Sequence, residues 1–152
     1  MDWLAVLTLA HVLSAFWYAA GYVGTNLCTE MARRSTTDDE CRSAILISGR
    51  LDRWANRTGG TAVGLTGLAL VAVSGRSFST PWILVSIVLF GAVVLAGIVL
   101  WARFGGGVEA AASSGDWAGV RRALNAPQAI AYGRIENVAV LTIVVLMVLQ
   151  PG

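Results

Sequence analysis

Apolar residues gather in four long blocks separated by polar segments. From Trp3 to Leu27 the chain has neither acid nor base, and three further apolar blocks cover residues 58–75, 82–102 and 127–149. At ~1.5 Å per helical residue, the first block reaches ~37 Å, enough to cross a hydrocarbon core of ~30 Å. The pattern predicts an all-α integral membrane four-helix bundle with up-down topology. We expect a single transmembrane domain over residues 1–152.

The polar segment between the first two blocks, residues 28–57, contains a helix start. Thr37 and Glu40 have the spacing of a capping box. The apolar positions that follow fall on one helical face: Ala44, Ile47, Leu51 and Trp54. This pattern predicts an amphipathic helix at the membrane surface. An extension of the second span, broken or bent at Gly59-Gly60, is an equal alternative.

The last polar connection follows the glycines at 105–107. Its segment DWAGVRRAL, residues 116–124, predicts a short surface helix. Asn125 has the residue type of an N-cap, and Pro127 suits the first turn of the fourth helix. We expect that helix to end at Leu149 or Gln150.

The composition agrees with a membrane protein. Apolar residues make up 56% of the chain and charged residues 13%, whereas soluble domains carry about 25% charged residues. All eleven basic side chains are arginines, which excludes Schiff-base and lysine-base chemistry. Arginines gather in the first and third connections, whereas the second contains only Arg76. The positive-inside rule therefore predicts a multi-pass protein of the cell inner (cytoplasmic) membrane with both termini outside.

His11 is the only histidine of the chain, and it lies inside the first apolar block. An ionisable side chain inside a membrane is a candidate functional group. It belongs to a polar stripe with spacings of three and four residues, formed by Thr8, His11, Ser14, Tyr18, Tyr22 and Thr25. Two interpretations are open. The stripe either hydrogen-bonds to neighbouring helices, at ~0.6 kcal/mol per group, or forms a cofactor or substrate site.

Haem b is the candidate cofactor for His11. Histidine is a common axial ligand, and Phe16, Trp17 and Tyr18 would suit a porphyrin wall. Because the chain has no second histidine, the iron would be five-coordinate or ligated symmetrically in a dimer. We predict no other metal site, since scattered Met and Cys residues do not make a soft-ligand cluster.

The fourth block begins with a polar cluster, AYGRIENVAV, which contains Tyr132, Arg134, Glu136 and Asn137. Arg134 and Glu136 are two residues apart, so on a helix they point to nearly opposite sides. Arg134 can reach the membrane surface, whereas the shorter Glu136 must be protonated, hydrogen-bonded or paired. Counted from the outer ends of their helices, Tyr18 and Arg134 lie at a similar depth of ~22 Å. We therefore predict an intramembrane polar layer of Ser14, Tyr18, Tyr22, Tyr132, Arg134, Glu136 and Asn137.

Four segments carry a resemblance to a known family: LAHVLSAFWYAAGYVG, RLDRW, TGLAL and VVLMVLQPG. Through them the chain resembles an uncharacterised family of small bacterial four-helix integral membrane proteins, a domain of unknown function. The resemblance implies four membrane helices and no particular activity.

The first helix is also similar to that of the bacterial membrane-type protoporphyrinogen oxidases, which carry a histidine there and bind haem. Their pattern includes a lysine on a later helix. This chain has no lysine, so the likeness does not extend to the oxidase chemistry.

These observations predict a small polytopic membrane protein that acts as an accessory or structural subunit of a membrane assembly. Its expected partners are the lipid bilayer and other membrane subunits or further copies of itself, without nucleic acid. The alternative function is a haem-binding membrane redox protein using His11. A transporter has less support, because the spans carry few charges and no internal repeat is evident. The sequence assigns no reaction.

Overall fold

The computed structural model describes residues 2–100 and 105–150. Every regular element within these ranges is helical, which confirms the all-α prediction. The chain divides into two compact units, Met1–Ser77 and Phe78–Gly152. Each unit is described below by itself.

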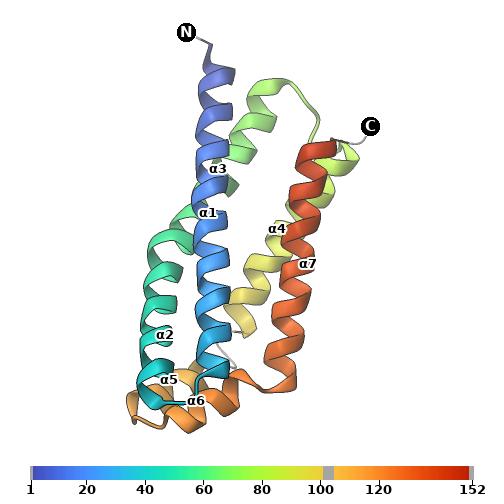
Figure 1. Cartoon of the computed structure of the whole chain (residues 1–152). Helices are drawn as coiled ribbons and strands as arrows, with labels where there is room; N and C mark the ends of the chain where they lie inside the picture. The colour runs from blue at the N-terminus through green and yellow to red at the C-terminus, as the bar shows by residue number, and fades with distance from the viewer. Residues whose placement is uncertain (1, 101–104, 151–152) are drawn as a thin grey trace. The chain divides into compact units, whose positions relative to one another are not determined.

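The first unit consists of two long helical stretches side by side. Helix α1 covers Trp3–Arg34 and extends well past the predicted span end at Leu27. The second stretch contains α2 (Asp38–Leu51), the π-helix η1 (Asp52–Arg57) and α3 (Thr58–Ser74), which follow one another without a break. It runs antiparallel to α1 along nearly its whole length (Figure 1). Gly75, in the left-handed conformation at φ 70°, ends α3.

The predicted capping box is confirmed at the start of α2. The Thr37 side chain accepts from the Glu40 backbone N–H, while the Glu40 carboxylate accepts from the Thr37 backbone N–H. The backbone N–H groups of Thr36 and Thr37 hold the pKa of Glu40 below its usual range, because they stabilise the ionised carboxylate. The chain therefore turns sharply between Arg34 and Asp38 with its backbone donors satisfied.

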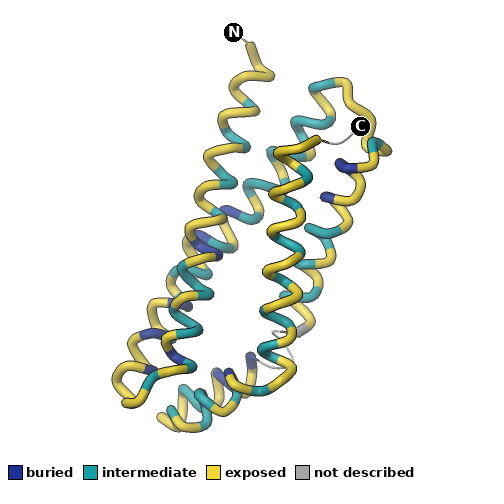
Figure 2. The backbone as a smooth tube through the Cα atoms, turned by 45° about the vertical axis from the view of Figure 1, so that its right-hand side comes forward, coloured by how far each residue is buried: buried dark blue, intermediate teal, exposed yellow. Residues whose placement is uncertain are grey.

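Residues 38–57 continue directly into the helix of residues 58–74, as the extension alternative predicted, and do not form a separate helix. Their buried side is made of small residues, Cys41, Ala44, Ser48 and Ala55, and this side faces α1 (Figure 2). Of the predicted apolar face, Ile47 is 49% and Trp54 73% exposed. The small residues decide the orientation because they let α2 and α1 approach closely. Nor does the helix break at Gly59-Gly60; the irregular turns come earlier, in η1.

Two glycines bring the helix backbones of the first unit into direct contact. A Cβ atom placed on Gly21 would lie 2.4 Å from the Asn56 backbone nitrogen. One placed on Gly59 would lie 2.6 Å from the Tyr18 backbone nitrogen. No side chain fits at either position without moving a helix. The two helices therefore meet most closely between these glycines.

The second unit contains α4 (Pro81–Leu100), α5 (Gly106–Ser113), α6 (Trp117–Leu124) and α7 (Pro127–Leu149). Helix α4 packs along α7, and α5 packs against α6. The short helix predicted at 116–124 is confirmed as α6 with Asp116 as its N-cap, and Pro127 stands in the first turn of α7. The predicted end of the third span at Ala102 lies outside the described residues.

The prediction that Asn125 caps the fourth helix is wrong. Ala126 is the N-cap of α7, while Asn125 ends α6. The Asn125 side-chain amide donates to the Arg121 carbonyl at 2.9 Å. Its amide group thus adds a second hydrogen bond to a carbonyl in the last turn of the preceding helix, beside the Asn125 backbone N–H, and does not cap the N–H groups of the following helix.

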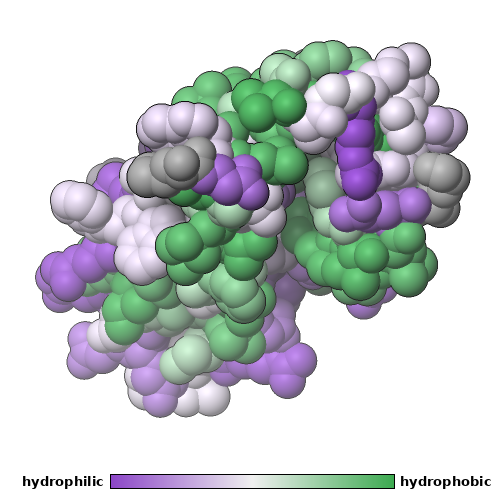
Figure 3. All heavy atoms as spheres, turned by 90° about the horizontal axis from the view of Figure 1, so that it is seen from above, coloured by the Kyte–Doolittle hydropathy of each residue, from purple (hydrophilic) through white to green (hydrophobic). Residues whose placement is uncertain are grey.

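Within the described ranges, three helices are long and apolar enough to cross a membrane: Trp3–Arg34, Pro81–Val99 and Pro127–Leu149. Helix α3, with 17 residues, is shorter. Many large apolar side chains of these helices are exposed, and apolar patches are visible on the face seen in Figure 3. The span expected at residues 58–75, and with it the four-helix up-down bundle, stays a prediction.

Replacing Gly59 with Ala should destabilise the first unit. The new Cβ would overlap the α1 backbone, and overpacking of this kind typically costs about 1–3 kcal/mol. Gly49→Ala, in the same helical stretch, is the matched control. Its Cβ would meet Arg53 Nη1 at an ordinary 3.7 Å, and replacing a mid-helix glycine should stabilise the helix. Thermal unfolding in detergent should separate the two variants, and equal melting temperatures would refute the contact.

Candidate functional site

The His11 side chain binds the hydroxyl of Thr66 across the two long helices. His11 Nδ1 lies 3.0 Å from Thr66 Oγ1. The same hydroxyl donates its single hydrogen to the Ala62 carbonyl at 2.6 Å. We therefore assign the Nδ1–H group of His11 as the donor to Thr66. In this neutral tautomer, Nε2 keeps its lone pair.

Gly67 makes room for the imidazole. A Cβ atom at this position would lie only 3.1 Å from His11 Cε1. The ring is thus packed against the α3 backbone, with Thr66 beside it. His11 and Thr66 are 55 residues apart in sequence. Their bond places the single histidine of the chain at a contact between two helices.

The other polar residues of the predicted stripe make different contacts at the two ends of α1. Near the start of α1, Thr8 and Ser14 donate to carbonyls of their own helix, those of Leu4 and Ala10. Further along, the rings of Tyr18 and Tyr22 lie 5.8 Å apart, and Tyr22 is buried. A Cβ atom on Gly60 would meet the Tyr18 ring at 3.4 Å. The two tyrosines therefore lie toward the second helical stretch.

The π-helix η1 gathers polar contacts that the sequence analysis missed. Trp17 Nε1 on α1 lies 3.1 Å from both the Trp54 carbonyl and the Thr58 hydroxyl. Within η1, Arg57 Nε donates to Asp52 Oδ2 at 2.7 Å, and Asn56 Nδ2 donates to Asp52 Oδ1 at 3.0 Å. The wider π-helical turn brings positions i and i+5 to the same side, so Asp52 reaches Arg57. Such segments often mark functional positions in helices.

Two side-chain oxygens at this level are buried and have no hydrogen-bond partner among the described residues. They are Thr25 Oγ1 on α1 and Asn56 Oδ1 in η1. Nearby, Ser48 and Thr29 share a contact of 3.4 Å between their hydroxyl oxygens. Polar side chains therefore join the two helices at this level as well as at the His11–Thr66 contact.

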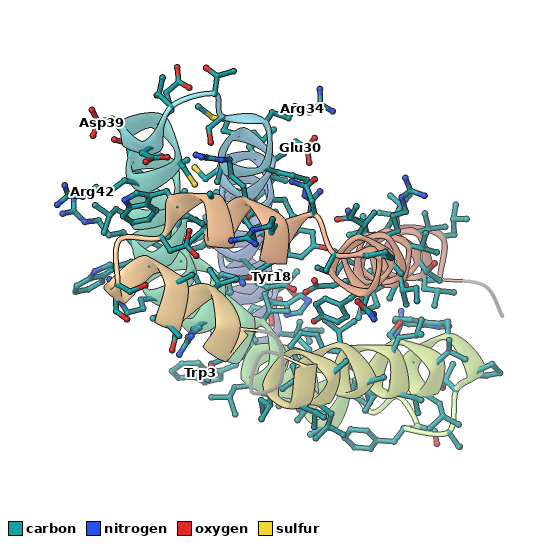
Figure 4. The ribbon with its side chains drawn as sticks, turned by 90° about the horizontal axis from the view of Figure 1, so that it is seen from below. Trp3, Tyr18, Glu30, Arg34, Asp39 and Arg42 are labelled. Atoms are coloured by element: carbon teal, nitrogen blue, oxygen red, sulfur yellow. The ribbon has the colours of Figure 1, made fainter. Side chains whose placement is uncertain are left out.

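Charged residues gather at the turn between α1 and α2, and some of them form ion pairs. Glu30 accepts from both Arg33, at 2.8 Å, and Arg34. Figure 4 shows Glu30 and Arg34 together at the end of α1, with Asp39 and Arg42 on the outer side of α2. This end of the unit is strongly polar.

The polar cluster of α7 divides between two sides of the helix. Tyr132 and Glu136, four residues apart, are partly buried. The Tyr132 hydroxyl lies 3.6 Å from the Cβ position of Gly97, so this side faces α4. Arg134 and Asn137 are exposed, in agreement with the opposite directions expected for Arg134 and Glu136. The polar layer predicted between the cluster and α1 would join the two units, and it stays a prediction.

Cys28 and Cys41 are free thiols. In the part of the chain that the structure describes, no three His, Cys, Asp or Glu side chains gather as a metal site requires.

Long apolar helices with exposed apolar side chains define an integral membrane protein. The chain belongs to the family described as "Predicted integral membrane protein (DUF2269)", which matches residues 5–151. This match confirms an uncharacterised membrane family. No curated protein and no solved structure matches the chain, and nothing in the comparisons supports the resemblance to the protoporphyrinogen oxidases.

The His11–Thr66 bond should be measurable by a double-mutant cycle of His11→Phe and Thr66→Val. We expect a coupling energy of about 0.6 kcal/mol, the average for hydrogen bonds between membrane helices. Thr61→Val replaces Thr66→Val in the control cycle, because the Thr61 hydroxyl bonds only the Arg57 carbonyl of its own helix. Unfolding in mixed micelles would give the energies. Equal coupling in both cycles would contradict the contact.

Proposed function

We propose that the chain is a four-pass accessory or structural subunit of a membrane assembly, in which α7 carries the contact with another subunit or a second copy. The observation that supports this function is the exposure of two polar side chains, Arg134 and Asn137, on a helix apolar enough to cross a membrane.

The depth of Asn137 makes exposure to lipid unfavourable. Asn137 lies ten residues after Pro127, ~15 Å along the helix and close to the middle of a ~30 Å core. Its short side chain cannot reach the membrane surface, in contrast to the long side chain of Arg134. A polar side chain at this depth is usually covered by protein. Its amide has more hydrogen-bonding groups than one contact uses.

In this proposal the membrane span that completes the four-pass topology is formed by η1 and α3. Helix α3 alone reaches ~25 Å, but η1 continues it without a break. Together they are long enough to cross the hydrocarbon core. With arginines concentrated in the first and third connections, this topology would put both termini outside the inner membrane.

Photo-crosslinking at Leu141 tests the assembly role. Leu141 is exposed and shares a helix face with Arg134 and Asn137, while Ile135, also exposed, lies roughly opposite Asn137. A crosslinking residue at 141 should give a protein adduct in native membranes, and one at 135 should attach to lipid. Vesicles with only the purified chain would then separate self-association from a different partner.

The polar pair itself supplies the second arm of this test. Adding Arg134→Leu and Asn137→Val to the Leu141 probe should lower the adduct yield by about threefold, corresponding to ~0.6 kcal/mol. Equal adducts from positions 135 and 141, or a yield independent of the polar pair, would overturn the proposed role of α7.

A haem-binding redox function at His11 is the second candidate. One observation favours it: His11 Nδ1 lies 3.0 Å from the Thr66 hydroxyl, and in the tautomer assigned above Nε2 would be the ring nitrogen available to a metal. Histidines that ligate metals commonly have their other ring nitrogen held in this way. His11 would hold the iron, which would supply the redox chemistry, and Thr66 would orient the ring.

An absorbance spectrum of the purified chain tests the haem function. The function requires a Soret band that is lost in His11→Ala and shifted in Thr66→Val. Ser14→Ala, one turn along α1, is the control and should leave the band unchanged. A chain that stays colourless after incubation with haem, yet retains its helical circular dichroism, would exclude this candidate.

A further inference from the structure

We infer that Arg50 and Arg53 bind the phosphate of an anionic phospholipid headgroup, beside the exposed ring of Trp54. The inference requires only that α1 crosses the membrane, and it does not depend on the assembly role of α7. It is derived from depth, exposure and charge at the junction of α2 and η1.

The depth of this junction follows from α1. The helix begins at the charged N-cap Asp2 and the exposed Trp3, which together mark a membrane interface because tryptophan prefers this level. A core of ~30 Å corresponds to ~20 helical residues, which ends at about Tyr22. The contact of Gly21 with Ala55 and Asn56 then sets the opposite boundary on the second stretch at Ala55.

Helix α3 leads to the same level independently. Counting ~20 residues back from Ser74, where α3 ends, again gives Ala55. Arg53 and Arg50 therefore lie ~3 Å and ~7.5 Å beyond the hydrocarbon core, within a headgroup layer ~5–8 Å thick. Arg42 lies ~20 Å beyond the core, outside this layer.

The side chains at this level have the chemistry of an interface. Trp54 is 73% exposed, and Arg50 and Arg53 are exposed as well. The indole ring favours the boundary between hydrocarbon and headgroups. Arg53 Nη1 lies 3.7 Å from the Cβ position of Gly49. Because Gly49 has no side chain, the guanidinium bends back along α2, away from the hydrocarbon and toward the turn that carries Arg50.

The charges around these two arginines are not balanced by the protein. Arg33 and Arg34 share Glu30, and Arg57 binds Asp52. In contrast, Arg50 and Arg53 make no ion pair or hydrogen bond within residues 2–100 and 105–150. Asp52, the nearest acid in sequence, is already bound by Arg57 and Asn56. Two guanidinium groups three residues apart thus remain available to an anion.

A lipid phosphate is the anion that fits this position. Guanidinium groups bind phosphate oxygens through paired hydrogen bonds. Phosphatidylglycerol keeps a net negative charge, whereas the choline of phosphatidylcholine neutralises its phosphate. An anionic lipid therefore gains about fivefold in affinity for each basic residue near the surface. Trp54 would contact the glycerol and upper acyl region of the same lipid.

The test measures lipid selectivity of the full chain in phosphatidylcholine vesicles that contain spin-labelled phosphatidylglycerol or spin-labelled phosphatidylcholine. The wild type should prefer the anionic label, and each of Arg50→Gln and Arg53→Gln should reduce that preference by about fivefold. Arg42→Gln is the matched control, because Arg42 is exposed on the same stretch but lies outside the headgroup layer. It should leave the preference unchanged.

Three results would overturn the site: a preference that survives the double variant, an equal loss in Arg42→Gln, or displacement of the lipid by millimolar inorganic phosphate. The last would indicate a site for free anions. Both arginines are exposed, so the double variant should keep its helical circular dichroism. Adduct formation from Leu141 should also be unchanged in the double variant, which keeps failure of the lipid site distinguishable from failure of the assembly role.

Discussion

The backbone contact between α1 and the second helical stretch is the constraint on which the first unit depends. Gly21 and Gly59 allow the two helices to approach until main-chain atoms touch. In a membrane, where apolar side chains gain little by leaving lipid, such close packing is a main source of helix association. The contact also sets the register of the pair, and thereby places His11 beside Thr66 and Trp17 beside Trp54.

The π-helix lies at the level of this contact and adds polar bonds to it. Its wide turn changes the hydrogen-bond pattern, and the Trp54 carbonyl receives the Trp17 indole and the Thr58 hydroxyl, the latter at 2.5 Å. The same geometry pairs Asp52 with Arg57 across five positions. A regular α-helix would separate these charges around its axis. The irregular turns therefore neutralise an acid next to the membrane boundary, while neighbouring arginines stay available.

Local signals in the sequence predicted the start of α2, the proline at the start of α7, helix α6 and the apolar blocks. Each depends on residues within a few positions of one another. The continuation of α1 to Arg34 was not predicted in this way, and the union of α2 with α3 was only one of two equal alternatives. The capping box indicated a helix within the polar residues 28–57, but the local pattern did not show that Cys41, Ala44 and Ser48 would be its buried side. His11 was identified as a candidate from its isolation, but Thr66 lies 55 positions away, and no local pattern connects the two.

The charged groups of the chain serve different environments in the two units. On the first unit, carboxylates neutralise Arg33, Arg34 and Arg57 and leave Arg50 and Arg53 exposed at headgroup depth. On the second, Arg134 and Asn137 are exposed inside an apolar span, where lipid headgroups cannot reach Asn137. A lipid phosphate suits the first pair, whereas a polar side chain at the depth of Asn137 is usually covered by protein. Contacts with lipid and with a partner would therefore use separate surfaces, so that either can be removed by mutation without loss of the other.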